Sequence, residues 1–132
     1  MRRLHTTRGF TLIELLVVVA VIIVLATMAM AQHKNGYIHA KEAVLREDLF
    51  RLRDSTDQYY GDKGKYPATL DALVTEGYLR KIPVDPFTES AETWQTIPAE
   101  ADSNNPTTEP GIYNVKSGSD GTALDGTKYA DW

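Results

Sequence analysis

An apolar run of membrane-spanning length near the N-terminus constrains this chain more than any other feature. Residues 10–31 form a stretch of 22 residues with a single charge, that of Glu14, which lies close to its start. A helix needs about 20 apolar residues to cross a hydrocarbon core of about 30 Å. The sequence therefore predicts a transmembrane helix over residues 10–31 and leaves the rest of the chain for one domain.

Charge is distributed unevenly on the two sides of this run. Arg2, Arg3 and Arg8 precede it, and no acid occurs among the first nine residues, so the positive-inside tendency predicts a cytoplasmic N-terminus. Removing these three arginines from the net charge of -4 leaves -7 for the remainder, with the acid excess in the C-terminal third. Binding of nucleic acid through a basic patch is therefore not expected of the exported part.

A cleaved secretory signal is an alternative interpretation of the N-terminus. Such signals have an apolar stretch of about 7 to 15 residues followed by a cleavage site with small residues. Here the apolar stretch is longer, and Glu14 falls where that stretch would begin. We therefore favour a retained membrane helix.

Residues 32–60 predict an amphipathic helix that continues the apolar run. Its apolar positions recur at spacings of 7, 4, 3, 4 and 3 and share one face: Ile38, Leu45, Leu49, Leu52, Thr56 and Tyr59. Charged side chains are expected on the other face, where Glu42–Arg46 and Glu47–Arg51 have the i,i+4 spacing of favourable ion pairs. Asn35-Gly36 is the weakest point, because glycine costs a helix about 1 kcal/mol relative to alanine.

Residues 61–132 predict a small globular head of loops and short elements. Glycines at both ends of the segment 61–64 are expected to end the long helix. A short helix is expected over residues 69–74, with Thr69 as its N-cap and Gly77 beyond its end.

Strands are expected over residues 93–97 and 111–116, and a weaker candidate covers residues 127–130. The polar, proline-containing segment 99–111 between the first two is expected to be an exposed loop. The fold class is therefore α+β, with a long N-terminal helix packed on a small antiparallel sheet.

The sequence does not predict an enzyme. The chain has no cysteine, which excludes a thiol nucleophile and a disulfide, and no glycine-rich phosphate loop follows a strand. Its histidines are His5, His33 and His39, and the last two do not share a helical face. Without a local signature of a catalytic triad, we expect a non-catalytic protein.

The C-terminal segment, residues 117–132, is acidic and rich in glycine. Asp120, Asp125 and Asp131 lie in it beside turns that direct backbone carbonyls inward, and calcium takes six to eight oxygen ligands in irregular loops. The spacing is not that of an EF-hand, so two Asp-Gly turns between short strands remain the alternative. A head of 72 residues without a disulfide would gain stability from a bound metal, which favours calcium.

The junction before the apolar run carries the most specific motif, Arg8-Gly9-Phe10-Thr11-Leu12-Ile13-Glu14. It resembles the prepilin signature of type IV pilins and type II secretion pseudopilins. The resemblance implies that residues 1–9 are a leader, that a membrane prepilin peptidase cuts between Gly9 and Phe10, and that Phe10 is then N-methylated.

The following residues are similar to the major pseudopilin of type II secretion. The similarity lies in residues 59–67, with their Tyr-Pro turn, in residues 69–83, and in Asp85-Pro86. Residues 111–132 resemble that family's calcium-binding region, which implies a structural calcium ion held by Asp120 and Asp125, backbone carbonyls at Val115 and Ser117, and Asp131 as a third acid. Two departures are the Ala31 region, where the family often has a proline, and a loop at residues 117–121 that is about one residue shorter.

The resemblance implies a type IV pilin-like fold and a structural subunit anchored once in the bacterial inner membrane, with a periplasmic head. The subunit would polymerise with its own copies, minor pseudopilins and an inner-membrane assembly platform. The resulting periplasmic filament would drive folded proteins through an outer-membrane secretin, powered by a cytoplasmic ATPase. A surface type IV pilin for adhesion, motility or DNA uptake and a membrane-anchored protein that never polymerises remain alternatives.

Glu14 has a defined role under the filament interpretation. An acid at the centre of a membrane helix costs about 2.5–3.5 kcal/mol, and less near the end, so such a group is a functional candidate. Cleavage after Gly9 would create a positive amine on Phe10, four residues away. The sequence therefore predicts that Glu14 neutralises the Phe10 amine of a neighbouring subunit, whereas a tolerated acid near the interface is the structural alternative.

Overall fold

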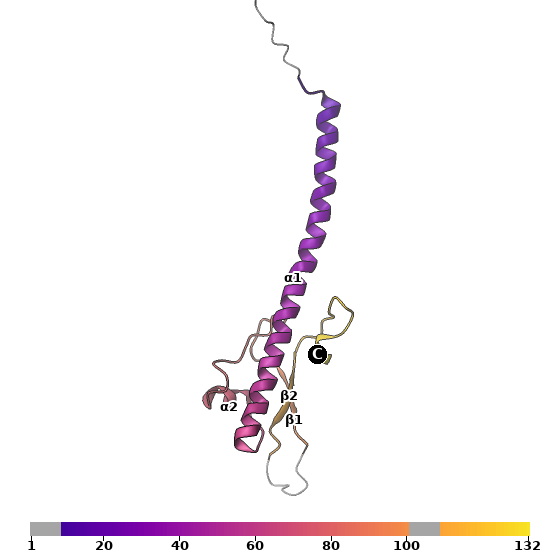
Figure 1. The fold of residues 1–132 in the computed structure, drawn as a ribbon. Coiled ribbons are helices and arrows are strands. Elements are labelled where there is room, and N and C mark those ends of the chain that lie inside the picture. Colours follow the sequence, from indigo (N-terminus) through magenta and orange to yellow (C-terminus); the bar gives the residue numbers. More distant parts are fainter. Residues whose placement is uncertain (1–8, 101–108) are drawn as a thin grey trace, which may run out of the picture. The chain divides into compact units, whose positions relative to one another are not determined.

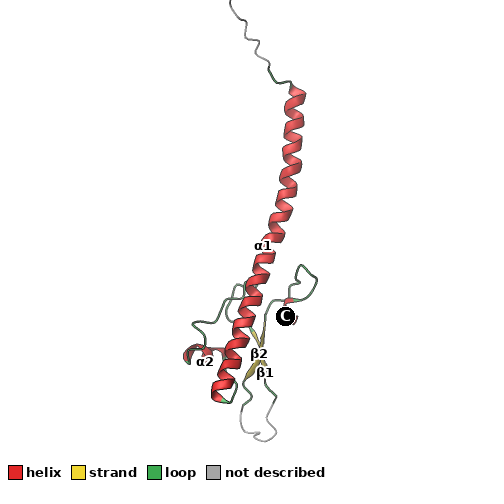
Figure 2. Ribbon diagram, in the orientation of Figure 1, coloured by secondary structure: helices red, strands yellow, loops and turns green. Residues whose placement is uncertain are grey.

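The computed structural model describes residues 9–100 and 109–132, so the leader residues 1–8 and the centre of the expected loop at 99–111 lie outside the described residues. The chain divides into two compact units, one ending at Tyr37 and one formed by residues 38–132. Its elements are α1 (Leu12–Lys63), α2 (Leu70–Thr75), β1 (Gln95–Pro98), β2 (Ile112–Lys116) and a 3-10 helix, η1 (Tyr129–Asp131). Figure 1 follows them along the sequence and Figure 2 distinguishes helices from strands.

The ends of α1 are set by local chemistry. At its start, the Thr11 hydroxyl oxygen accepts a hydrogen bond from the Glu14 N–H at 3.3 Å, as an N-cap side chain does. At its end, Gly64 has a φ of +67° and donates its N–H to the Tyr60 carbonyl at 2.8 Å. A left-handed glycine directly after a helix is a common stop, so the expected end within residues 61–64 is confirmed.

The helical assignment continues through Asn35-Gly36, the position where the sequence is weakest. A single glycine costs a helix about 1 kcal/mol relative to alanine, which neighbouring helical hydrogen bonds offset. Both ends of the helix lie a few residues after the expected ones, since α1 begins at Leu12 rather than Phe10 and ends at Lys63 rather than Tyr60.

The head half of α1, residues 38–63, buries the face that the periodicity predicts. Leu45, Leu49, Leu52, Thr56 and Tyr59 are buried and Ile38 is half-buried, so this prediction is confirmed. The three leucines form one core cluster with residues in or beside β1, β2 and η1 and in the C-terminal loop: Trp94, Ile112, Val115, Ala123 and Tyr129. Full burial of one such side chain stabilises the fold by about 1.5–3 kcal/mol, so this cluster holds the sheet on the helix.

The sheet has two antiparallel strands and lies beside the head half of α1 (Figure 2). Gln95 pairs with Lys116 and Ile97 with Asn114, and the register is irregular between Ile97 and Pro98. All four residues of β1 are exposed, whereas β2 buries Ile112 and Val115 in the core. The two stronger strand predictions are thus confirmed to within a few residues, and β2 is the strand that faces the helix.

The weaker strand prediction over residues 127–130 is wrong. The segment makes one isolated bridge, between Thr122 and Lys128, and then turns into η1. Local bonds replace a ladder, since Asp131 donates its N–H to the Lys128 carbonyl at 3.0 Å. The Tyr129 ring stacks on Phe87 at a centroid distance of 4.0 Å, and burial of this ring takes precedence over strand pairing.

The short helix α2 confirms its predicted caps. Thr69 has an extended backbone, and its hydroxyl oxygen accepts the Ala72 N–H at 3.3 Å. Gly77 follows with a φ of +85°, and the Tyr78 N–H returns to the Leu73 carbonyl at 2.9 Å. This tight stop turns the chain back toward α1, where the Ser55 hydroxyl donates to the Tyr78 carbonyl at 3.4 Å.

Candidate functional site

The predicted cleavage point lies outside regular structure. Gly9 and Phe10 precede the first residue of α1, and both are exposed. A peptide bond that is exposed and outside a helix is accessible to a peptidase.

Glu14 lies in the first turn of α1, where its environment gives it a local role that the sequence analysis did not assign. Thr11 and Glu14 have the Thr-x-x-Glu spacing of a capping box, in which each residue stabilises the helix start. A negative charge in the first turn also interacts favourably with the helix dipole. The signal was present in the sequence, and it means that a test of Glu14 must separate its charge from its capping role.

The membrane half of α1, residues 12–37, is mostly apolar and exposed. Among the residues that the structure describes, α1 is the one helix long and apolar enough to span a membrane, and its apolar window has no buried residue. All described residues up to Tyr37 are exposed. So much contiguous apolar surface is stable only against lipid or another protein.

The predicted calcium ligands do not gather into a carboxylate cluster. Asp120, Asp125 and Asp131 are exposed, and residues 9–100 and 109–132 contain no group of three or more acidic, histidine or cysteine side chains that could hold a metal. Val115 is fully buried, and its carbonyl accepts a hydrogen bond from Arg53 Nη2 at 3.0 Å. Ser117 is also buried, and its hydroxyl donates to the Asp85 carboxylate. The donor set thus does not fit a calcium ion as arranged, and calcium stays a prediction from the resemblance.

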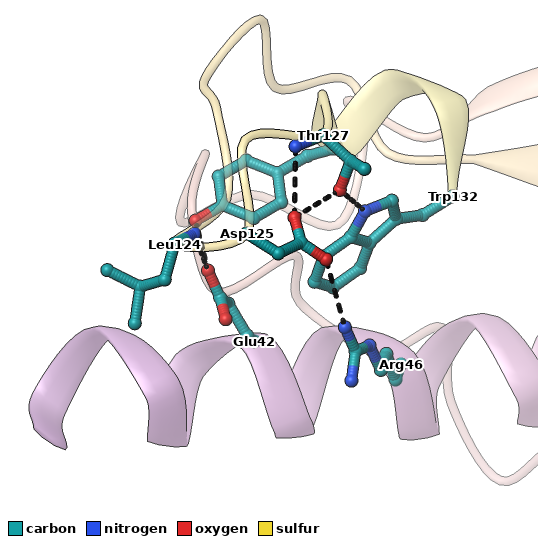
Figure 3. A network of polar contacts seen from close by, with 7 residues as sticks. Glu42, Arg46, Leu124, Asp125, Thr127 and Trp132 are labelled. Carbon is teal, nitrogen blue, oxygen red and sulfur yellow. Dashed lines mark hydrogen bonds and ion pairs between the residues drawn. The ribbon is translucent and has the colours of Figure 1, made fainter. Parts of the chain in front are cut away.

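Glu42 connects α1 to the C-terminal loop (Figure 3). Its Oε1 accepts the Leu124 N–H at 2.8 Å and the Tyr129 hydroxyl at 3.1 Å. Burial is the larger cause, and the hydrogen bond and charge of Glu42 are the next, of a pKa of Tyr129 that is raised to about 12. The sequence analysis placed Glu42 on the solvent face, and that placement is wrong: the side chain is 6% exposed. Its position seven residues before Leu49 was the signal, because that spacing puts both on one face.

Arg46 interacts with the C-terminal loop instead of with Glu42. Its guanidinium lies 4.0 Å from Asp125 Oδ2 and 4.3 Å from the centroid of the Trp132 ring. Asp125 Oδ1 accepts both the N–H and the hydroxyl of Thr127, at 2.9 and 2.6 Å, and these bonds lower the pKa of Asp125. The other predicted pair is confirmed, since Arg51 Nε lies 2.8 Å from Glu47 Oε1.

Asp85 is a further buried acid, which the sequence analysis named only within the similarity to the major pseudopilin. Its Oδ1 accepts the N–H groups of Phe87 and Thr88 at 2.8 and 3.3 Å, and its Oδ2 accepts the Ser117 hydroxyl. The carboxylate therefore fastens the loop after α2 to the end of β2. Its sequence signal is weak, because the Ser117 partner is 32 residues away.

Comparisons of the sequence with known proteins find one family model and several similar relatives. Residues 4–30 match the family model described as the prokaryotic N-terminal methylation motif. The type II secretion system core protein G of Pseudomonas aeruginosa is 36% identical over 95 aligned residues, covering 60% of this chain and 67% of the relative. Proteins of the same name from Klebsiella michiganensis and Escherichia coli are each 31% identical over 103 residues and cover 66% of this chain and 72% and 71% of the relatives. No solved structure matches the chain significantly.

Proposed function

The chain belongs to the family of the type II secretion system core protein G, and on this premise we propose how its residues serve the assembly of a secretion filament. Its role is that of a pseudopilin in type II secretion, and the comparisons do not favour a surface type IV pilin. The observation that carries the proposal is the methylation motif at residues 4–30, joined to an apolar helix whose membrane-length window has no buried residue within the described part of the chain.

Processing at the N-terminus is the first step. A prepilin peptidase removes residues 1–9 by cutting between Gly9 and Phe10, and Phe10 becomes N-methylated. The methylation motif and the exposed, non-helical backbone at both residues support this assignment. The cut leaves a positive amine four residues before Glu14, at the start of a helix that is otherwise uncharged as far as Ala31.

Assembly then pairs two charges within the apolar layer. Glu14 of one subunit neutralises the Phe10 amine of the next, and the low dielectric of the surroundings strengthens this attraction and penalises either charge alone. The apolar halves of α1 from neighbouring subunits pack together, and this packing holds the filament together without selecting one relative position. The Glu14–Phe10 pair sets the register between the subunits. The role is structural rather than catalytic.

The location and partners follow from the same arrangement. Before assembly, the subunit crosses the inner membrane once, with its N-terminus in the cytoplasm and its head in the periplasm. Within the filament it contacts its own copies, and it meets minor pseudopilins and the inner-membrane platform during assembly. The filament pushes folded proteins through the secretin, and nucleic acid takes no part.

A pair of variants separates the charge of Glu14 from its capping role. Glu14→Gln keeps a side chain suited to a capping box and removes the charge, whereas Thr11→Ala removes the cap and keeps the charge. We expect Glu14→Gln to accumulate as a processed monomer in the membrane and to block secretion, and Thr11→Ala to assemble. Cross-linking of filaments and secretion of cargo measure both. Normal assembly of Glu14→Gln, or equal failure of both variants, would contradict the charge pairing.

The type of filament is tested by deletion. A strain without this chain should retain its cargo in the periplasm, and the intact gene should restore secretion. Normal secretion with loss of surface fibres would sink the pseudopilin assignment in favour of a pilin. Normal secretion without any filament phenotype would indicate a membrane-anchored protein that does not polymerise.

A further inference from the structure

Arg53 is the polar centre of the head. Its Nε donates to Asn114 Oδ1 at 2.8 Å, and its Nη2 donates to the carbonyls of Val115 and Trp132 at 3.0 and 2.7 Å. One half-buried guanidinium thereby connects α1 with β2 and with the last residue of the C-terminal segment. The rigid, forked donor geometry of arginine suits such a bridge, because several N–H groups point at separate acceptors at once.

Arg46 places a second positive charge seven residues earlier on α1. Its guanidinium lies over the Trp132 ring and 4.0 Å from Asp125 Oδ2, as Figure 3 shows for the ion pair. Asp125 and Arg46 are both more than half exposed, so solvent screens their attraction. A calcium ion on Asp125 would nevertheless have to approach a cation that the Trp132 ring already holds in place.

Two of the groups that the resemblance assigns to calcium already interact with donors of the protein. The Val115 carbonyl accepts from Arg53, and the Asp125 carboxylate accepts two bonds from Thr127 and lies beside Arg46. Calcium takes six to eight oxygen ligands. Calcium bound through these groups would compete with the Arg53 bond that connects α1 to β2 and with the Thr127 bonds that shape the loop.

We propose that Arg53 and Arg46 hold the C-terminal segment in place of calcium, at two of the groups that the resemblance assigns to that ion, the Val115 carbonyl and the Asp125 carboxylate, so that the head folds without a divalent cation. Arg53 joins β2 to the segment through the backbone oxygens of Val115 and Trp132, and Arg46 holds the segment through Asp125 and the Trp132 ring. Glu42 supports the same closure from one turn earlier, because it binds Leu124 and Tyr129. This inference concerns folding of the head and stands apart from the role in secretion.

The first experiment compares melting of the full-length chain in detergent with calcium chloride and with the chelator EGTA. We expect the same Tm in both. A calcium ion bound with a Kd a hundredfold below its concentration would raise the Tm of a head of this size by roughly 10 °C. A clear rise with calcium would overturn the proposal, and loss of that rise in Asp125→Ala would establish the calcium site that the resemblance implies.

The second experiment tests the arginine itself with a matched control on the same helix. Arg53→Ala should lower the Tm well below that of Arg51→Ala, and calcium should not restore it. The exposed Arg51 side chain donates to Glu47 on the same helix and is the matched control. Arg53→Lys keeps the charge and loses the fork, so its Tm should fall between those of Arg53→Ala and the natural chain. Equal melting of Arg53→Ala and Arg51→Ala, or of Arg53→Lys and the natural chain, would contradict the proposed bridge.

Discussion

The two halves of α1 have the same secondary structure and opposite surroundings. Residues 12–37 are all exposed within their unit, although most of them are apolar. In the head half, seven residues are buried: Glu42, Leu45, Leu49, Leu52, Ser55, Thr56 and Tyr59. The first half is apolar on all sides, whereas the second half is apolar on one face. The distribution of apolar residues around the helix axis, rather than their number, therefore indicates which surfaces of each half are covered.

This difference also explains which polar residues each half tolerates. The buried face of the head half includes Thr56, whose hydroxyl bonds the Leu52 carbonyl at 2.8 Å, and Glu42, which binds the C-terminal loop. These groups are satisfied within the chain. Glu14 in the membrane half contacts Thr11 through its backbone N–H, and its carboxylate accepts no hydrogen bond within the described residues, which leaves this group available for another subunit.

The sharpest test replaces one leucine in each half. Leu52→Ala should lower the unfolding free energy of the head by about 2–5 kcal/mol, because it opens a cavity in the core. Leu25→Ala, the matched change at an exposed membrane position, should leave that free energy unchanged. Both tryptophans, Trp94 and Trp132, lie in the head, so urea unfolding followed by their fluorescence reports on the head alone. Equal destabilisation by the two changes would remove the distinction between the halves.

Removal of the buried carboxylate should have the next largest effect. Glu42→Ala leaves the Leu124 N–H and the Tyr129 hydroxyl without their acceptor, which should cost about 1–3 kcal/mol of stability. Glu42→Gln keeps an oxygen that accepts both bonds, so its loss should be smaller. The same urea titration measures both, and identical stability of Glu42→Ala and the natural chain would show that the loop does not depend on this contact.

High pH should loosen the same closure. The pKa of Tyr129 is raised from about 10 to about 12, so the folded head binds this proton more tightly than the unfolded chain does. Its contribution to stability is complete below pH 10 and is lost as the pH rises toward 12. Tyr129→Phe lacks the titrating group, so its stability should fall less steeply over this range. Parallel pH profiles for both proteins would contradict the assignment.

The outward face of the head half should give the smallest effect. Arg51→Ala breaks the exposed pair with Glu47 and should cost less than about 0.5 kcal/mol. Salt should reduce this loss further, because surface pairs are screened. A loss approaching that of Leu52→Ala would mean that this face is covered by a partner rather than by water.

Local features were predictable because their causes are close in sequence. Thr69 caps α2 by bonding the N–H three residues later, and Gly64 ends α1. The spacing of Leu45, Leu49 and Leu52 identifies the buried face of α1 without reference to the rest of the fold. The strand prediction for residues 127–130 was wrong because its cause is not local. The Tyr129 ring stacks on Phe87, 42 residues earlier, and the residues around Tyr129 give no sign of this contact.

The sequence by itself determined the membrane half, the prepilin-like junction with Gly9, Phe10 and Glu14, and the buried stripe of the head helix. These features depend on local motifs, on composition and on the spacing of apolar residues, all of which can be read from the sequence. Only the tertiary structure decided that Glu42 binds Leu124 and Tyr129 and that Arg53 bridges α1, β2 and the C-terminal segment, through bonds between residues 61 to 87 positions apart. Periodicity says which face of a helix is covered, but the partner of a polar side chain is known only once distant segments have been brought together.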